Sequence, residues 1–165
     1  MGEALSPPQP IRPEHDTASF RCGQPTLDDW LQNRALRSEG RSARTYVVTA
    51  RDRVVGYYCL ATAAVRKEET PRRLAGDMPS VVPVILIGRL AVDEGQAGRG
   101  LGAGLLRDAL SRALQVSQEL GCRAVLVHAI DDGAVGFYQK FGFQAFPAEG
   151  RTLFLPIKTI ADSLG

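Results

Sequence analysis

The chain has 165 residues, which is enough for one domain with a sizeable hydrophobic core. It is 44% hydrophobic and 23% charged, and its net charge is only +2, as is typical of an ordinary globular protein. These values exclude a chain that is disordered throughout, a collagen-like sequence and a coiled coil. The longest apolar stretches, at 81–88 and 124–130, are too short to cross a bilayer.

The first residues and the cysteines bear on where the protein works. No basic segment followed by an apolar core opens the sequence, so we expect no secretory signal and no contact with a membrane. The three cysteines, Cys22, Cys59 and Cys122, are odd in number and lack the Cys-x-x-Cys spacing of a metal site. We therefore expect no disulfide, no bound metal and a cytoplasmic location.

In chain order, the first half of the sequence predicts a helix followed by a β-hairpin. Four prolines in residues 1–13 favour a flexible tail. Residues 25–39 are typical of a helix, because apolar residues recur at helical spacing, a proline stands first and a glycine follows the end. Residues 44–50 and 54–65 are predicted strands joined in a hairpin. The charged residues 66–79 contain two prolines and a glycine, and they predict a loop with room for one helical turn.

The second half alternates strands and helices around a glycine-rich loop. Residues 95–104 contain five glycines in ten positions, and the apolar stripe that follows them predicts a long helix. This order of elements indicates a mixed sheet with helices, the α/β (α+β) class. The elements expected are a strand at 82–92, a helix at 101–120, a strand at 123–129, a helix from 131 or 132 to 140, and a terminal hairpin of strands at 144–146 and 152–156.

The glycine-rich loop, between a buried strand and a long helix, is typical of an anion site. Glycines let the backbone approach a diphosphate closely, and the helix N-terminus offers free N–H groups and a positive dipole. A P-loop is excluded, because Leu105 follows Gly104 where a lysine and a hydroxyl residue are needed. A dinucleotide-binding fingerprint fits residues 98–103 poorly, because residues 93–96 intervene after the strand and the first half lacks a repeated βαβ order.

Two motifs resemble those of the GNAT acetyltransferase superfamily. Residues 97–102 (Ala-Gly-Arg-Gly-Leu-Gly) resemble its acetyl-CoA loop, except that Ala97 stands where glutamine or arginine is usual and Gln96 lies one place earlier. Residues 137–143 (Phe-Tyr-Gln-Lys-Phe-Gly-Phe) resemble its second signature, a helix that leads into Gly-Phe. The resemblance implies the GNAT fold, a central mixed, mostly antiparallel sheet flanked by helices, in a single acetyltransferase domain at 14–160.

A narrower resemblance, from His15 to Ile157, is to the GNAT toxins of bacterial toxin–antitoxin modules. Short pieces carry it, at 20–23 (Phe-Arg-Cys-Gly), 27–31 (Leu-Asp-Asp-Trp-Leu) and 87–93 (Ile-Gly-Arg-Leu-Ala-Val-Asp). Such toxins transfer acetyl from acetyl-CoA to the α-amine of aminoacyl-tRNA and so block translation. The resemblance also implies a homodimer and an antitoxin of the ribbon-helix-helix type.

The resemblance assigns roles to residues at matching positions. Tyr138 is the general-acid candidate, because a phenol with a pKa of about 10 is protonated at neutral pH and can donate to the departing CoA sulfur. The alternative is a core tyrosine with a satisfied hydroxyl. No general base is evident: we expect His128 to be a packed residue at a strand end, and an α-amine with a pKa near 8 or below needs no strong base. The candidate acetyl-CoA contacts are Leu90, Ala91, Val92, Gln96, Gly98, Arg99, Gly100, Gly102, Ala103 and Phe137.

Arginines make up most of the 20 basic residues, and their guanidinium groups suit phosphate. Taken alone, such charge runs favour a solvated surface, whereas with tRNA as substrate they become candidate contacts to it. Arg89 lies within an apolar strand, so it either pairs with a carboxylate or faces a substrate cleft. The candidate tRNA contacts are Arg89, Arg34, Arg37, Arg41, Arg44, Arg72 and Arg73.

Two other functions stay open on the sequence. The first is an acetyltransferase for a small amine or a protein N-terminus, which a tRNA-free reaction with little salt dependence would favour. The second is a CoA-binding protein without turnover, which unchanged behaviour after Tyr138→Phe would favour.

Overall fold

The computed structural model describes residues 4–76, 80–146 and 150–164. The chain divides into two compact units, and each is described by itself. The first unit comprises residues 1–61 and 88–109, and the second comprises residues 62–87 and 110–165.

The sheet of the first unit is antiparallel where β1 (Gln9–Pro10), β2 (Arg44–Ala50) and the first part of β3 (Arg53–Arg66) pair. The β2–β3 hairpin closes on the pair Ala50–Arg53, and Arg51 in its turn has a φ of 58°. The end of β4 (Val81–Val92) follows β3 in the strand order. The hairpin confirms the two strands predicted on either side of residues 51–53.

Residues 5–11 pair with the sheet, although a flexible tail was expected over residues 1–13, of which residues 1–3 lie outside the described residues. Ser6 donates its N–H to the Thr49 carbonyl at 2.8 Å, and Ile11 donates its N–H to the Thr45 carbonyl at 3.0 Å. Ile11 is also buried in the core. Prolines are tolerated on an edge strand, so proline content alone does not separate a tail from such a strand.

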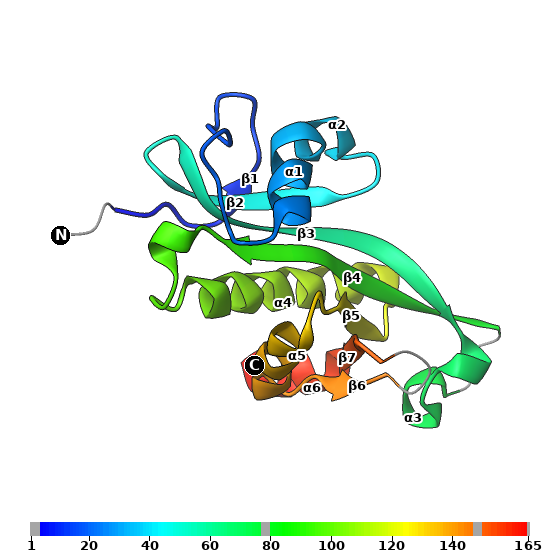
Figure 1. Cartoon of the computed structure of the whole chain (residues 1–165). Helices are drawn as coiled ribbons and strands as arrows, with labels where there is room; N and C mark the ends of the chain where they lie inside the picture. Colours follow the sequence, from blue (N-terminus) through cyan, green and yellow to red (C-terminus); the bar gives the residue numbers. More distant parts are fainter. Residues whose placement is uncertain (1–3, 77–79, 147–149, 165) are drawn as a thin grey trace. The chain divides into compact units, whose positions relative to one another are not determined.

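Two helices, α1 (Pro25–Asn33) and α2 (Ala35–Ser38), replace the single helix expected at 25–39. The chain leaves helical geometry at Arg34, where φ is −128°. Apolar spacing hid this break, because the apolar positions stay in helical register through it. Figure 1 shows both helices against β2 and β3. The shared core of helices and strands contains Phe20, Trp30, Leu31, Ala35, Val47, Val54 and Tyr57.

The start of α4 (Leu101–Leu120) packs closely on β3 in the first unit. A Cβ added at Gly56 would lie 3.1 Å from side-chain atoms of both Leu101 and Leu105, so this glycine permits the approach. The Tyr58 hydroxyl donates a hydrogen bond to the Asp108 carboxylate on α4. These contacts fix the N-terminal half of the helix that the sequence predicts at 101–120.

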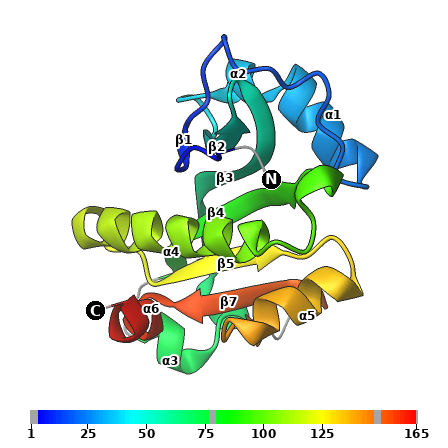
Figure 2. The ribbon, with the colours of Figure 1, turned by 90° about the vertical axis from the view of Figure 1, so that its left-hand side faces the viewer.

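The second unit continues the sheet with the end of β3, the start of β4, β5 (Ala124–His128), β6 (Gln144–Ala145) and β7 (Thr152–Pro156). β4 and β5 are parallel, whereas β5–β7 and β6–β7 are antiparallel, and Figure 2 shows β5 and β7 side by side. Over the described residues the strand order is β1-β2-β3-β4-β5-β7-β6. The expected mixed, mostly antiparallel sheet is therefore confirmed.

The helices of the second unit begin and end where the sequence places their signals. α4 ends at Leu120, and Gly121, which follows it, has a φ of 69°. α5 (Asp132–Lys140) begins after Asp131, whose carboxylate accepts the Ala134 N–H at 2.8 Å. The expected loop at 66–79 contains two short helices, η1 (Lys67–Glu69) and α3 (Arg72–Ala75).

The sequence analysis missed a last helix, α6 (Ile157–Leu164), which follows β7 directly. Ile160 on this helix is 1% exposed, so α6 belongs to the packed part of its unit. None of the helices in the described ranges combines the length and the apolar character that crossing a bilayer requires.

Candidate functional site

The glycine-rich loop begins at the end of β4 with a buried carboxylate. Asp93 accepts the Gly95 N–H at 2.9 Å and so caps the short helix η2 (Glu94–Gln96). Its other oxygen accepts the Arg21 N–H, also at 2.9 Å. The sequence analysis named Asp93 only as part of the loop and missed this anchoring contact, because its partner Arg21 is distant in the chain.

The next part of the loop presents backbone N–H groups with no partner. Gly98 and Gly100 have φ values of 77° and 81°, and an added Cβ would meet no atom within 4 Å at either glycine. In the stretch the structure describes, the N–H groups of residues 98–103 have no hydrogen-bond acceptor, and the first bond of the helix joins the Gly104 N–H to the Gly100 carbonyl at 3.1 Å. Unpaired N–H groups at the N-terminus of a 20-residue helix fit an anion.

The predicted acetyl-CoA contacts of the first unit are continuous along the end of β4, η2 and the start of α4. Gln96 is half-buried in η2, and Arg99 is exposed between the two left-handed glycines. Leu90, Ala91 and Val92 form the end of β4, where the Ala91 side chain is 5% exposed and lies in the core. The open backbone and the charge of Arg99 suit a diphosphate.

Arg89 lies over the ring of Trp30 and not against a carboxylate. Its guanidinium carbon is 4.3 Å from the ring centroid, and in the described ranges Arg89 forms no ion pair. A cavity of about 320 Å³ opens there. The ion-pair alternative left by the sequence is not found among the described residues, and the substrate cleft stays a prediction. The cavity is lined by Pro25, Thr26, Asp29, Trp30, Arg34 and Arg89.

The remaining arginines predicted to bind tRNA are not gathered in that cavity. Arg37, Arg41 and Arg44 are exposed, and Arg44 forms an ion pair with Glu39 at 3.4 Å. In an exposed position such a pair contributes little to stability. In the first unit the structure therefore brings together Arg34 and Arg89 and leaves Arg37, Arg41 and Arg44 on the surface.

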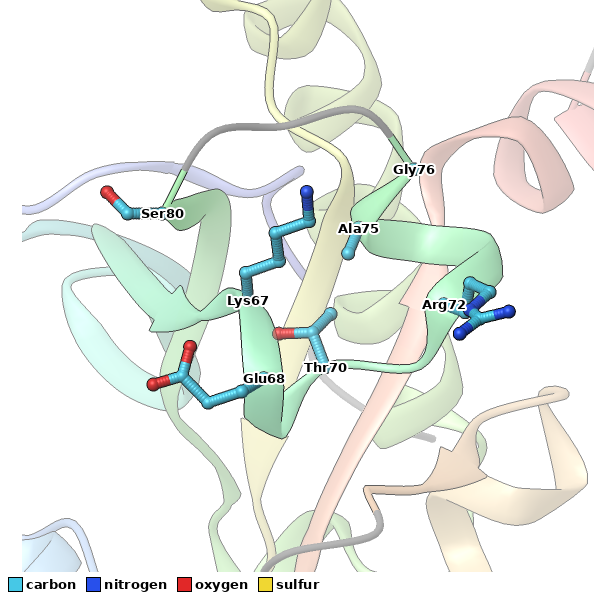
Figure 3. Close-up of a pocket in the computed structure, with 7 residues that line it drawn as sticks. All are labelled: Lys67, Glu68, Thr70, Arg72, Ala75, Gly76 and Ser80. Carbon is cyan, nitrogen blue, oxygen red and sulfur yellow. The ribbon is translucent and has the colours of Figure 1, made fainter.

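In the second unit, Arg72 shares a cavity of about 690 Å³ with Lys67. Figure 3 shows the Lys67 side chain extending into the space between Ser80 and Ala75, with Arg72 on the other side of Ala75. The prediction for Arg73 concerns a side chain outside the described residues.

Tyr138, the general-acid candidate, is 7% exposed on α5. Its ring lies edge-on to Phe143 at 5.4 Å and to Phe137 at 5.2 Å between centroids. The packed surroundings match the core alternative considered for this tyrosine, and they would also hold a phenol in one orientation. The role of Tyr138 stays a prediction.

The two histidines differ from each other. His15 is buried, its Nδ1 accepts the Arg12 N–H at 2.9 Å, and burial lowers its pKa, so its contacts are those of a structural residue. His128 is exposed at the end of β5, with Nδ1 at 2.9 Å from Thr152 Oγ1, so the expectation of a packed side chain is wrong. Thr152 is the residue that pairs with His128 between β5 and β7. Among the described residues, no group of three or more histidines, cysteines and acidic residues could hold a metal ion.

Comparison with known proteins identifies the class that this fold and loop define. Residues 41–145 match the model of the acetyltransferase (GNAT) domain family. The chain is 44% identical over 161 residues to a tRNA-acetylating toxin of Mycobacterium tuberculosis (strain ATCC 25618 / H37Rv), with 97% of each chain covered. It therefore belongs to the GNAT acetyltransferase family.

Two solved structures of the toxin AtaT are similar along almost the whole chain. AtaT complexed with acetyl-methionyl-tRNAfMet has a TM-score of 0.89 and 25% identity, over 98% of this chain and 100% of that one. A tyrosine-to-phenylalanine mutant of AtaT, bound to the C-terminus of the antitoxin AtaR and to acetyl-CoA, has a TM-score of 0.83 and 26% identity, over 98% of both chains. These relatives confirm the predicted resemblance to GNAT toxins.

Proposed function

We propose that this protein is a toxin-like N-acetyltransferase that moves acetyl from acetyl-CoA to the α-amine of aminoacyl-tRNA and so inhibits translation. The observation that carries the proposal is the open glycine loop at the start of α4, in a chain 44% identical to a tRNA-acetylating toxin. The loop supplies the donor site, and the relative supplies the class of acceptor. The cavity beneath Arg89 supplies cationic side chains that an RNA substrate needs.

The donor would be held mainly by the backbone. N–H groups of Gly98, Arg99, Gly100, Gly102 and Ala103 bind the diphosphate, and the Arg99 side chain adds a charge-assisted contact. Because backbone N–H groups bind the diphosphate, Ala97 in place of the usual glutamine or arginine is compatible with acetyl-CoA binding. The further contacts proposed are the backbone of Leu90, Ala91 and Val92, the side chain of Gln96, and Phe137.

The transfer itself needs a neutral amine and an acid for the leaving thiolate. The amine nitrogen forms a bond to the acetyl carbon, the thioester C–S bond breaks, and the amine gives up a proton to solvent. Tyr138 donates its phenolic proton to the CoA sulfur and recovers one from solvent. A free α-amine has a pKa near 8 and esterification lowers it, so a neutral fraction exists at pH 7 without a strong base.

The basic side chains would hold the RNA backbone. Arg34 and Arg89 act in one cavity, and Arg37, Arg41 and Arg44 extend the positive surface along the same unit. In the second unit, Arg72 contributes beside Lys67, together with Arg73. Each phosphate contact makes binding weaker as salt rises, so the reaction should slow steeply between low and moderate salt.

The partners follow from the relatives and from the family. AtaT is bound to a segment of its antitoxin AtaR, and we expect an antitoxin to bind this chain as well. We propose that the antitoxin combines a ribbon-helix-helix DNA-binding part with a tail that binds the toxin. We further propose a homodimer that acts in the cytoplasm, where charged tRNA is found.

The test is acetyl transfer from labelled acetyl-CoA to a mixed pool of charged tRNAs. Tyr138→Phe removes the phenolic proton and keeps the ring, so we expect it to lower kcat roughly a hundredfold or more, as for other general acids. The matched control is Tyr46→Phe, because Tyr46 lies on β2 and its ring stacks on Tyr58 at 5.2 Å between centroids. This control should retain full activity.

Each alternative function gives a different result. If acetyl-CoA binds but only free amines or peptide N-termini are labelled, the chain is a GNAT enzyme for another acceptor. If acetyl-CoA binds and no acceptor is labelled, while Tyr138→Phe behaves as the unmodified protein, it is a CoA-binding protein without turnover. Either outcome refutes the assignment to aminoacyl-tRNA.

A further inference from the structure

We propose that Asp93 and Asp28 are positioning residues that hold residues 20–23 between the acetyl-CoA loop and helix α1. Asp93 would fix the loop, and Asp28 would fix the helix that carries Trp30. The inference rests on the proposed function only in naming the two ligands, acetyl-CoA and tRNA. All of the contacts lie within the first unit.

On the loop side, Asp93 connects three segments of the chain. Its Oδ1 accepts the Arg21 N–H and its Oδ2 accepts the Gly95 N–H, both at 2.9 Å. Its own N–H donates to the Val55 carbonyl on β3 at 2.9 Å, and the next residue, Glu94, donates its N–H to the Arg21 carbonyl at 2.7 Å. Asp93 is 9% exposed, so little water competes for its oxygens.

On the helix side, Asp28 binds the same segment one residue further on. Its Oδ1 accepts the Cys22 N–H at 2.9 Å, and it is 8% exposed. Gln32, one turn along α1, donates from Nε2 to the Phe20 carbonyl at 3.2 Å. Residues 20–23 are thus bound on one side by the loop and on the other side by α1.

The contacts of Asp93 require a carboxylate for a geometric reason. An ionised carboxylate is acceptor-only on both oxygens, so Asp93 can receive two backbone N–H groups at once. Asparagine has one acceptor oxygen, and its amide would leave one of the two N–H groups facing another donor. The Gly95 N–H is one of them, and Gly95 lies in η2, just before the segment 98–103 whose N–H groups would bind the diphosphate.

A merely structural role would lower the stability of both variants and affect both ligands alike. If the two aspartates are positioning residues, each variant should weaken the binding of one ligand, coenzyme A or tRNA, and leave the binding of the other unchanged. We expect Asp93→Ala to weaken the binding of coenzyme A roughly tenfold or more and to leave uncharged tRNA binding within about twofold, since a lost buried charge-assisted bond has an effect of this size. We expect Asp28→Ala to do the reverse. Each variant is the matched control of the other, because the two carboxylates are equally buried and bind the same segment.

The measurements are calorimetric titration with coenzyme A, filter binding of uncharged tRNA, and amide exchange of Gly95 and Cys22. Exchange at Gly95 should rise in the Asp93 variant, and exchange at Cys22 should rise in the Asp28 variant. If the alanine variants fail to fold, Asp93→Asn serves in place of Asp93→Ala, and Asp28→Leu, which has no acceptor oxygen, serves in place of Asp28→Ala. Equal effects of both variants on both ligands, or no effect on either, overturn the proposal. Failure of the unmodified protein to bind coenzyme A would refute the proposed function, and amide exchange would still decide whether the two aspartates hold residues 20–23.

Discussion

The acetyl-CoA loop allows a sharp test of whether its glycines are needed for backbone conformation. Gly98 and Gly100 have φ values of 77° and 81°, in the left-handed region that L side chains rarely adopt. An added Cβ would meet no atom within 4 Å at either position. Alanine there would therefore suffer no clash, and any effect must come from the backbone itself.

The size of the expected effect follows from the cost of the left-handed backbone conformation alone. An L-residue in the left-handed region costs about 1–2 kcal/mol relative to glycine. If Gly98→Ala or Gly100→Ala keeps the native loop, the free energy of unfolding should fall by about this amount, and the midpoint of thermal unfolding by roughly 2–8 °C for a chain of this size. If the loop relaxes instead, stability is retained and the affinity for coenzyme A falls by a comparable factor of about 5–30.

Gly104→Ala is the matched control. Gly104 also has open space around an added Cβ, but it lies inside α4 without a left-handed φ. Alanine is about 1 kcal/mol better than glycine in a helix, so this variant should be more stable and should bind coenzyme A as before. Urea unfolding can be followed by the fluorescence of the single tryptophan, Trp30, and affinity by calorimetry. If Gly98→Ala and Gly100→Ala match the unmodified protein in both stability and affinity, the backbone argument is refuted.

Two further predictions concern titratable side chains. Burial, followed by the charge of Arg12, lowers the pKa of His15, and its Nδ1 accepts an N–H, so the folded state disfavours the protonated ring. The contribution of His15 to the free energy of unfolding should therefore be fully present above the unfolded pKa of about 6.5 and should be lost as the pH falls toward 5. The variant His15→Gln does not titrate, so its free energy of unfolding, measured in urea, should fall less over this range. Burial, with a smaller contribution from Asp28, raises the pKa of Cys22 from 9.0 to about 11. Alkylation of Cys22 at pH 8, followed by mass spectrometry, should be roughly a hundredfold slower than that of free cysteine, and a comparable rate would contradict the burial.

The elements that the sequence predicts well are those with local signals. Helix α4 is bounded by a glycine-rich start and by Gly121, and α5 begins at the Asp131 cap, so both follow from residues that are neighbours in the chain. Strand β1 and the break at Arg34 carry no such signal. The first depends on hydrogen bonds to β2, and the second interrupts a helix whose apolar spacing is unchanged.

The candidate site also has one part that could be predicted from local sequence and one part that could not. Glycine permits the positive φ values found at Gly98 and Gly100, so the loop could be predicted as an anion site from its sequence. The surroundings of Arg89 could not, because a cation in an apolar strand is equally compatible with an ion pair and with a cleft. The contact of the guanidinium group with the ring of Trp30, on α1, appears only in the folded chain.

Asp93 shows why the residues that position a site are harder to identify than those that form it. Its first bond, to the Gly95 N–H, joins neighbouring residues and caps η2 locally. Its second bond, to the Arg21 N–H, joins residues 72 positions apart, and no local pattern indicates it. Because Arg21 takes part through its backbone, the residue type at that position carries no information about the contact. The side chain of Arg21 should therefore be replaceable without loss of coenzyme A affinity, whereas that of Asp93 should not.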